Sequence, residues 1–329
     1  MSEANTINRI IYPWQQEQWD LMLQAVDQQR LPHAMLFTGE TGVGKADFAA
    51  HLAGLLLCLS PENNKACGKC HACSLLAAET HPDLDIVSPE DSNVIKVDQI
   101  RQLVEKNALT PHISMRKIYL LIEAEKMNSA ASNSLLKTLE EPSSNTLIIL
   151  VTARPDLLSA TIRSRCQQIK FNKPGRQDTL DWLSTFELTQ TPEKLLNIVS
   201  GGPLAALQLD RSGEAELYDE VFADFGRVIF GKSDPIKVAE QWQKNDLERI
   251  FNWLAIWVID IIRLKFDNDS PLIKCADKHK GLLKIAGAFQ QDQLFAIYNQ
   301  QLKAMGLLQK TINKTLLVEN FLVSCITDR

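Results

Sequence analysis

A glycine-rich segment ending in lysine, residues 39–45 (Gly-Glu-Thr-Gly-Val-Gly-Lys), limits most strongly how this chain can fold. It follows an apolar run at residues 34–38 and opens a helical pattern, which is the strand–loop–helix setting of a P-loop. Glycines let backbone N–H groups turn inward around phosphate oxygens, the helix N-terminus adds positive potential, and the lysine neutralises the β and γ oxygens. The candidate nucleotide-binding residues are Gly39, Gly42, Gly44 and Lys45.

Short apolar or β-branched runs alternate with amphipathic stretches through the first half of the chain. This pattern predicts strands at residues 34–38, 84–87, 118–122, 147–152 and 168–171, and helices at 45–59, 98–108 and 129–141. Strands separated by helices pair in parallel through right-handed crossovers, so this part belongs to the α/β class. Ligands of such sheets bind beyond the carboxyl ends of the strands.

The strand pattern stops after Phe171, and helical periodicity fills the rest of the chain. Breaks at Pro174-Gly175 and Ser212-Gly213 predict an α/β domain over residues 1–173, a small helical domain over 174–212 and a larger helical domain over 213–329. The most apolar stretch, residues 250–264, is too short to span a bilayer and is expected to be a core helix.

The phosphate loop departs from a working ATPase at its metal and water positions. A Ser or Thr that binds Mg²⁺ should follow the lysine, and Ala46 stands there. The strand near residue 120 should end in an Asp for the metal and a Glu for the attacking water, but Glu123-Ala124 follows it. Glu123 could still reach a metal, whereas the methyl group of Ala124 cannot polarise water.

A third departure lies in the helical part, where an arginine that touches the γ-phosphate usually follows a Gly-Ser pair. The corresponding stretch begins at Gly201 and has Leu204 at the arginine position. The three losses predict a nucleotide fold without ATP hydrolysis. ATP binding is expected to be absent or weak, and weak residual binding through Lys45 stays open.

Four of the seven cysteines cluster within sixteen residues, at a spacing of Cys-x8-Cys-x2-Cys-x2-Cys. Four thiolates at such spacings bind structural Zn²⁺ in a closed tetrahedral site, and the residues between them are polar and turn-forming. His71 and His81 are expected not to be ligands, and four free thiols are the competing interpretation. The predicted zinc ligands are Cys58, Cys67, Cys70 and Cys73, in an insertion over residues 58–73.

Composition excludes several other classes of protein. The formal net charge of −5 argues against a protein that lives mainly by wrapping nucleic acid. No apolar segment of a secretory signal follows the polar first residues, so a cytoplasmic protein without a membrane association is expected. Cysteines of a cytosolic chain are rarely disulfide-bonded, and Cys166, Cys275 and Cys325 are interpreted as buried apolar residues.

Several motifs together resemble the bacterial DNA polymerase III clamp-loader ATPases, which are AAA+ proteins. The segment 133–142 (Asn-Ser-Leu-Leu-Lys-Thr-Leu-Glu-Glu-Pro) is similar to that family's central helix, and Ser164-Arg165-Cys166 is similar to its Ser-Arg-Cys motif. The cysteine insertion after the P-loop helix matches as well, and the resemblance is dense over roughly the first 210 residues. The departures at Ala46, Ala124 and Leu204, with Tyr12-Pro13-Trp14, are closest to the delta-prime branch, which lacks the motor residues.

The resemblance implies an AAA+ (RecA-like) domain, a helical lid and a C-terminal collar that joins five subunits in a hetero-oligomeric arc. The implied partners are the motor subunits and the delta subunit, and through the complex the sliding clamp and primed DNA. It also implies that Arg165 acts in trans as an arginine finger on a neighbour's ATP. Arg163 is the second candidate, and a surface arginine in a salt bridge is the competing interpretation.

Three functions therefore stay open: a non-hydrolysing clamp-loader subunit, an active AAA+ clamp-loader-type ATPase, and a zinc-containing nucleic-acid-binding module on an inactive P-loop fold. The three departures favour the first.

Overall fold

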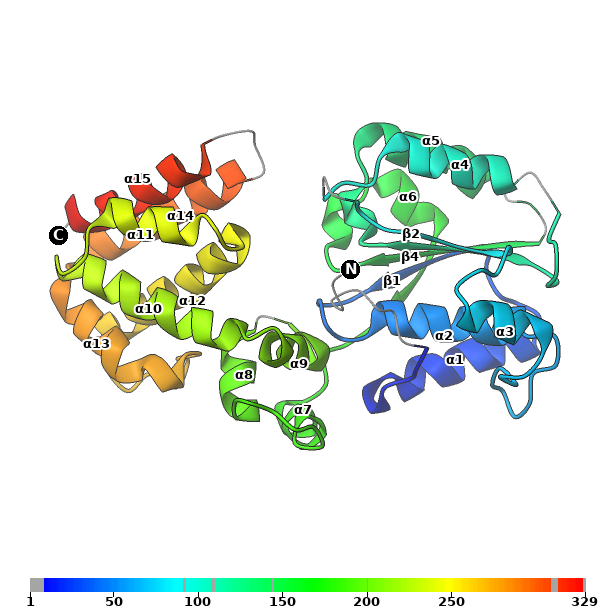
Figure 1. The fold of residues 1–329 in the computed structure, drawn as a ribbon, viewed down its shortest axis with the longest axis horizontal. Coiled ribbons are helices and arrows are strands. Elements are labelled where there is room, and N and C mark those ends of the chain that lie inside the picture. Colours follow the sequence, from blue (N-terminus) through cyan, green and yellow to red (C-terminus); the bar gives the residue numbers. More distant parts are fainter. Residues whose placement is uncertain are drawn as a thin grey trace. The chain divides into compact units, whose positions relative to one another are not determined.

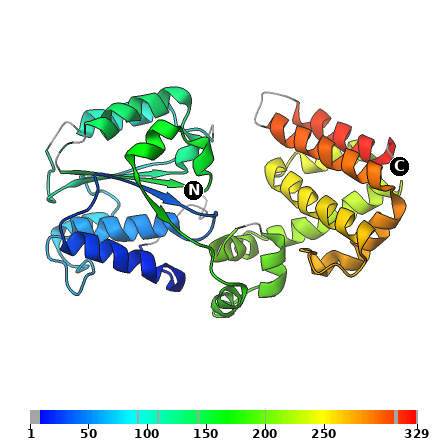
Figure 2. The same cartoon turned by 180° about the vertical axis from the view of Figure 1, so that it is seen from behind.

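The computed structural model describes residues 9–90, 93–107, 110–141, 143, 145–199, 201–308 and 313–327. Contacts divide the chain into two compact units (Figures 1 and 2). Unit 1 contains Met1–Thr179 and Gly201–Ala205, and unit 2 contains Leu180–Ser200 and Ala206–Arg329. The finer division into three domains stays a prediction.

Unit 1 is built on a five-stranded parallel sheet in the order β2-β3-β4-β1-β5. All five predicted strands are confirmed to within one residue at each end. Every residue of the neighbouring central strands β1 and β4 is buried, as continuous apolar runs require when both faces of a sheet are covered. The strands are β1 (Ala34–Thr38), β2 (Leu84–Val87), β3 (Lys117–Ile122), β4 (Thr146–Thr152) and β5 (Gln167–Lys170).

Helices cover both faces of this sheet. Figure 1 shows α1 (Gln16–Asp27), α2 (Lys45–Leu57) and α3 (His71–Ala77) on one face. The other face carries α4 (Val97–Asn107), α5 (Ser129–Glu140) and α6 (Ala160–Arg165). Strand residues alternate between the two cores, so that Phe37 packs with α2 and Leu36 packs with the opposite layer.

The helix predictions need three corrections. The helix after the phosphate loop ends at Leu57, two residues earlier than predicted. The end of another predicted helix, 98–108, lies outside the described residues. Helix α1 has no counterpart among the predicted helices, since its first turn is rich in glutamine. His71 and Ala72, which the cysteine spacing predicts to be turn residues, begin α3 instead.

Unit 2 is helical, and two helices, α7 and α9, run across the boundary between the units. Among the described residues it contains no named strand. Its helices are α7 (Arg176–Leu183), α8 (Pro192–Ile198), α9 (Pro203–Arg211), α10 (Glu214–Ile229), α11 (Pro235–Trp242), α12 (Leu247–Phe266), α13 (His279–Ala288), α14 (Gln291–Leu308) and α15 (Lys314–Thr327).

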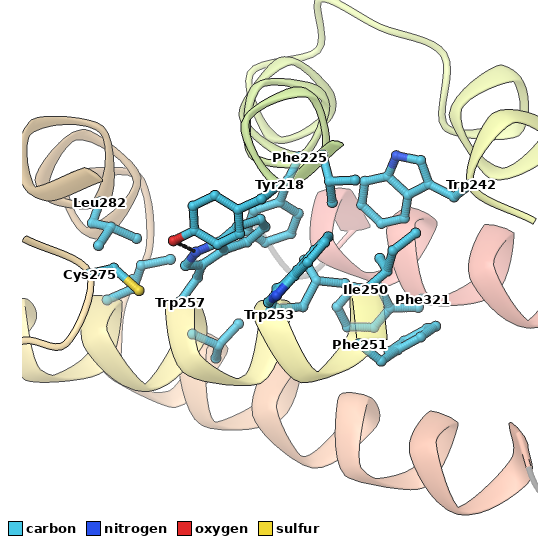
Figure 3. Close-up of a cluster of buried hydrophobic side chains, with 14 of the residues drawn as sticks. Tyr218, Phe225, Trp242, Ile250, Phe251, Trp253, Trp257, Cys275, Leu282 and Phe321 are labelled. Carbon is cyan, nitrogen blue, oxygen red and sulfur yellow. Dashed lines mark hydrogen bonds between the residues drawn. The ribbon is translucent and has the colours of Figure 1, made fainter. Parts of the chain in front are cut away.

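The predicted core helix at residues 250–264 is confirmed as the central part of α12. Phe251, Trp253 and Trp257 of this part are buried, and Figure 3 shows Trp257 beside Tyr218 of α10. Asp260 lies within this apolar helix because its carboxylate accepts backbone N–H bonds from Lys274 (2.9 Å) and Cys275 (2.8 Å) and an Nη1–H bond from Arg263 (3.0 Å). Among the described residues, no helix combines the length and apolar character that a membrane span requires.

Tyr218→Phe is expected to destabilise unit 2 by about 1–3 kcal/mol. The Trp257 Nε1–H donates to the Tyr218 hydroxyl at 2.9 Å, and the substitution would leave this donor buried without its acceptor. Urea unfolding followed by tryptophan fluorescence measures the change. Tyr298→Phe, at the partly buried edge of the same core, is the control and should cost less than about 0.5 kcal/mol. Equal losses in the two variants would contradict the expected role of the Tyr218 hydroxyl.

Candidate functional site

The phosphate loop lies between β1 and α2, at the carboxyl end of the sheet's strands. Gly42 and Gly44 adopt left-handed backbone conformations, with φ of 77° and 83°. Neighbouring groups also require glycine here: a Cβ on Gly44 would lie 2.5 Å from the ring of Tyr12, and one on Gly42 would lie 2.6 Å from the backbone nitrogen of Ala205. The loop therefore has the geometry predicted for it, and two other segments pack directly against it.

Side chains of the segment before α1 donate hydrogen bonds to carbonyls on one side of the phosphate loop. The Gln15 side-chain amide donates to the carbonyls of Val43 (2.8 Å) and Gly44 (2.9 Å). The Trp14 indole N–H also donates to Val43, at 3.0 Å, and the Tyr12 hydroxyl donates to the Asp47 carboxylate of α2 at 2.9 Å. The carbonyls on this side of the loop thus have protein donors.

The segment Gly201–Ala205 donates backbone hydrogen bonds to carbonyls on the other side of the loop. The backbone N–H of Gly202 donates to Thr41 at 2.7 Å, and that of Leu204 donates to Gly42 at 2.9 Å. The structure therefore brings the stretch that lacks the γ-phosphate arginine against the loop, as its sequence position suggested. Its contribution is made through the backbone, and no side chain in it can replace an arginine.

Lys45 is folded into the loop that it closes. Its Nζ donates to the carbonyls of Gly39 and Glu40, each at 2.7 Å, and the residue is 6% exposed. Burial lowers the pKa of Lys45 to about 8, although the nearby carboxylates of Glu125 and Glu40 oppose this change. The loop retains a positive charge that suits phosphate, but its own carbonyls already hold the ammonium group.

The end of β3 carries a different acid arrangement from the one predicted. Glu123 has a positive φ of 55° and its carboxylate pairs with Lys126 at 3.0 Å, while Ala124 is completely buried. The sequence analysis missed Glu125, whose Oε1 accepts the backbone N–H of Ala153 at 3.2 Å beyond β4. No local motif marks Glu125, because its partner is 28 residues away.

The four clustered cysteines converge after α2, as their spacing predicted. Their sulfur atoms all lie within 4.8 Å of one another, with Cys58 and Cys70 at 3.9 Å and Cys67 and Cys73 at 4.0 Å. Four sulfurs about 2.3 Å from a tetrahedral zinc lie roughly 3.8 Å apart, so the group fits this ion. Backbone N–H groups donate hydrogen bonds to three of the sulfurs, those of Cys58, Cys67 and Cys70.

A buried polar network joins the start of this knuckle to the sheet. The Ser114 hydroxyl donates to the carbonyl of Leu57, immediately before Cys58, and lies 3.2 Å from His81 Nε2. The other ring nitrogen of His81 accepts the Asp83 backbone N–H at 3.1 Å. Because protein groups engage both ring nitrogens, His81 has no free atom for a metal, and its exclusion as a ligand is consistent with the structure.

Arg165 is the last residue of α6, a helix that Ser159 caps by accepting the N–H of Ile162. Its guanidinium donates through Nη2 to Glu140 Oε1 at 2.6 Å and through Nη1 to the Thr161 carbonyl at 3.1 Å. About a third of the Arg165 side chain remains exposed. Glu140 ends α5, so the two motifs on which the family resemblance depended meet here, although Pro142 lies outside the described residues.

The fold and the loop define a class. A parallel sheet in the order β2-β3-β4-β1-β5, with a P-loop between its fourth strand in that order and α2, makes unit 1 an AAA+-type P-loop domain. Two family models match the chain, one described as DNA polymerase III, delta subunit, over residues 14–175 and one as its C-terminal part over residues 214–327. The chain belongs to the DNA polymerase III delta-prime subunit family.

Relatives in three bacteria support this assignment. The DNA polymerase III subunit delta-prime of Pseudomonas aeruginosa is 36% identical over 95% of this chain and 96% of its own length. Those of Haemophilus influenzae and Bacillus subtilis are 29% and 31% identical over 91% and 77% of this chain, covering 87% and 78% of their own lengths. A solved DNA polymerase III gamma subunit-related protein of Thermotoga maritima aligns with a TM-score of 0.44 and 15% identity over 95% of this chain and all of its own.

We expect one zinc per chain in protein purified without added metal, because the four sulfurs already lie at tetrahedral separations. X-ray absorption should show sulfur-only ligation at roughly 2.3 Å. Cys67→Ser should reduce zinc content and destabilise the knuckle, whereas Cys325→Ser, which changes a buried cysteine of unit 2, should retain full zinc. Zinc below about a fifth of an equivalent in fresh wild-type protein would contradict the site.

Proposed function

We propose that this chain is a non-hydrolysing subunit of a DNA polymerase III clamp loader. In this proposal it assembles with motor subunits and a delta subunit through a C-terminal collar, over residues 213–329. The complex loads the sliding clamp onto primed DNA, and Arg165 completes the ATP site of a neighbouring motor subunit. The delta-prime relatives support the assembly, and the geometry of unit 1 supports the division of labour within it.

The observation that carries the proposal is the contrast between the chain's own loop and its arginine. The loop lacks the metal hydroxyl at Ala46 and the water-polarising acid at Ala124, and it has Leu204 in place of a γ-phosphate arginine. Arg165, in contrast, ends a short helix with part of its side chain exposed and its charge held by a single carboxylate. A group in this state can exchange its partner for phosphate oxygens at a small cost.

The position of α6 between two paired strands also supports this role for Arg165. Its helix α6 lies between β4 and β5, and these strands pair with β1 on either side. Arg163 is exposed on the same helix, two residues earlier, but it lies outside the Ser164-Arg165-Cys166 motif that supports the finger, and the ion pair of Arg165 with Glu140 does not by itself distinguish a finger from a surface salt bridge. We therefore assign the finger to Arg165 and keep Arg163 as the comparison residue.

An active AAA+ ATPase is the second candidate, because Lys45 and the complete glycine loop remain. The purified wild-type chain is expected to release no phosphate from ATP above background. Each missing group acts on the γ-phosphate, its metal or the attacking water, so the losses fall on the same transition state. The measurement is steady-state phosphate release, with Lys45→Ala as the control. Hydrolysis that disappears in Lys45→Ala would establish the ATPase alternative and contradict the proposed non-hydrolysing role.

Arg165→Ala is expected to depress ATP turnover at the one interface that it serves by about 10³–10⁵-fold, equivalent to roughly 4–7 kcal/mol of barrier. Clamp loading by the assembled complex should fall with it, while total ATP turnover falls only in part because the motor subunits keep their own sites. Stability should change by less than about 1 kcal/mol, because the ion pair with Glu140 is partly exposed.

The matched control is Arg163→Ala, which removes the same charge from the same helix and should have little effect on loading. Complex assembly, measured by gel filtration, should be unchanged in both variants. Loading at the wild-type rate by a complex that carries Arg165→Ala would make Arg165 an ordinary surface residue.

A further inference from the structure

Glu125 is an acidic residue near the phosphate loop. The absence of the catalytic groups does not explain why an acid lies here. It lies in the short 3-10 helix Ala124–Lys126, directly after β3. One carboxylate oxygen accepts the N–H of Ala153, and the other is buried without a hydrogen-bond partner among the described residues. An unpartnered buried carboxylate oxygen is costly, so a compensating charge or function is expected nearby.

The strand register places this carboxylate beside the phosphate loop. Ala153 follows Thr152, which pairs directly with Thr38 of the adjacent strand β1. Thr38 precedes Gly39, whose carbonyl accepts a hydrogen bond from Lys45 Nζ. The hydrogen bond to Ala153 therefore holds Glu125 at the carboxyl end of β4. The adjacent strand β1 leads there to the Gly39 carbonyl that holds Lys45.

The carboxylate of Glu125 affects the pKa of Lys45. Burial lowers the pKa of this lysine, and among the charges that oppose the decrease, the carboxylate of Glu125 acts most strongly. The two side chains form no direct ion pair, because Lys45 donates instead to the carbonyls of Gly39 and Glu40. Glu125 therefore faces the buried ammonium group at a distance and supplies negative charge to its surroundings.

We propose that Glu125 is a resident counter-ion of the phosphate loop, which balances Lys45 and lowers the affinity of the loop for nucleotide phosphates. A catalytic role for this carboxylate is not favoured, since Ala46 removes the hydroxyl that would hold the metal. Like charges repel strongly in a partly buried site, so this carboxylate would oppose the binding of a triphosphate beside Lys45. The inference rests on the proposed non-hydrolysing function and names a residue that keeps the loop free of nucleotide.

The test compares Glu125→Gln with the wild-type full-length chain. Glutamine keeps an oxygen for the Ala153 N–H, removes the charge and replaces the second carboxylate oxygen with an NH₂ group of similar size. Calorimetry with ATPγS and Mg²⁺, and separately with inorganic tripolyphosphate, should show binding at least about tenfold tighter in Glu125→Gln. Tripolyphosphate has no base or sugar, so its arm reports on the phosphate cradle alone. Asp156→Asn removes one exposed carboxylate three residues after Ala153 and should leave both affinities unchanged.

A second measurement does not depend on a ligand. In an NMR titration of the Lys45 side chain, the pKa of about 8 should fall in Glu125→Gln, because the ammonium group loses a stabilising anion. An unchanged lysine pKa would overturn the proposal, as would equal affinities of the wild type and Glu125→Gln or an equal gain in Asp156→Asn. ATP turnover by the wild-type chain would instead contradict the non-hydrolysing function, and the ATPγS comparison would still report on the counter-ion.

Discussion

The outward carbonyls of the phosphate loop hold together three segments that are far apart in the sequence. Gln15 donates to Val43 and Gly44, while Gly202 donates to Thr41. A buried carbonyl without a donor costs about 1–3 kcal/mol, so this loop can exist only where such donors are supplied. The loop is thus a structural junction as well as a phosphate cradle, and removing it would leave both flanking segments without partners.

This dual use explains how the glycine pattern can persist where the catalytic groups do not. Gly42 and Gly44 are required by their positive φ and by the close approach of Ala205 and Tyr12, whether or not a phosphate binds. Ala46 and Leu204 are only partly buried, and a hydroxyl or an arginine at these positions would act on a nucleotide, whereas Ala124 is itself a completely buried core residue. Packing therefore preserves the glycines independently of chemistry.

The sequence predicts the buried part of unit 1 well because burial dictates composition there. A strand such as β4 is apolar throughout, and its limits follow from where that run begins and ends. The spacing of the cysteines likewise predicts their convergence, since two intervening residues bring sulfurs to one side of a turn. Helix α1 was missed because its polar first turn hides the apolar face formed by Trp19 and Met22.

What the sequence could not predict are the contacts that depend on the completed sheet. Glu125 meets Ala153, and Ser114 meets Leu57, only after the strands have paired, and neither pair has a local signature. The ion pair of Glu140 with Arg165 also depends on the completed sheet, since it forms only when α5 and α6 pack on one face of that sheet. These contacts are therefore set by the packing of the completed sheet and its helices, not by a local motif.

The register also links the phosphate loop to the proposed finger. Helix α6 connects β4 to β5, and β1, which ends in the phosphate loop, lies between these two strands in the sheet. Met35 pairs with Gln167 only two residues after Arg165, so a shift of β1 would displace the end of α6 as well. The contacts of the loop help to hold β1 in place, and through β1 the position of Arg165, whether or not the loop binds a nucleotide. In the proposed function, a loop without hydrolysis and a finger at Arg165 are compatible because the two properties depend on different atoms of one shared framework.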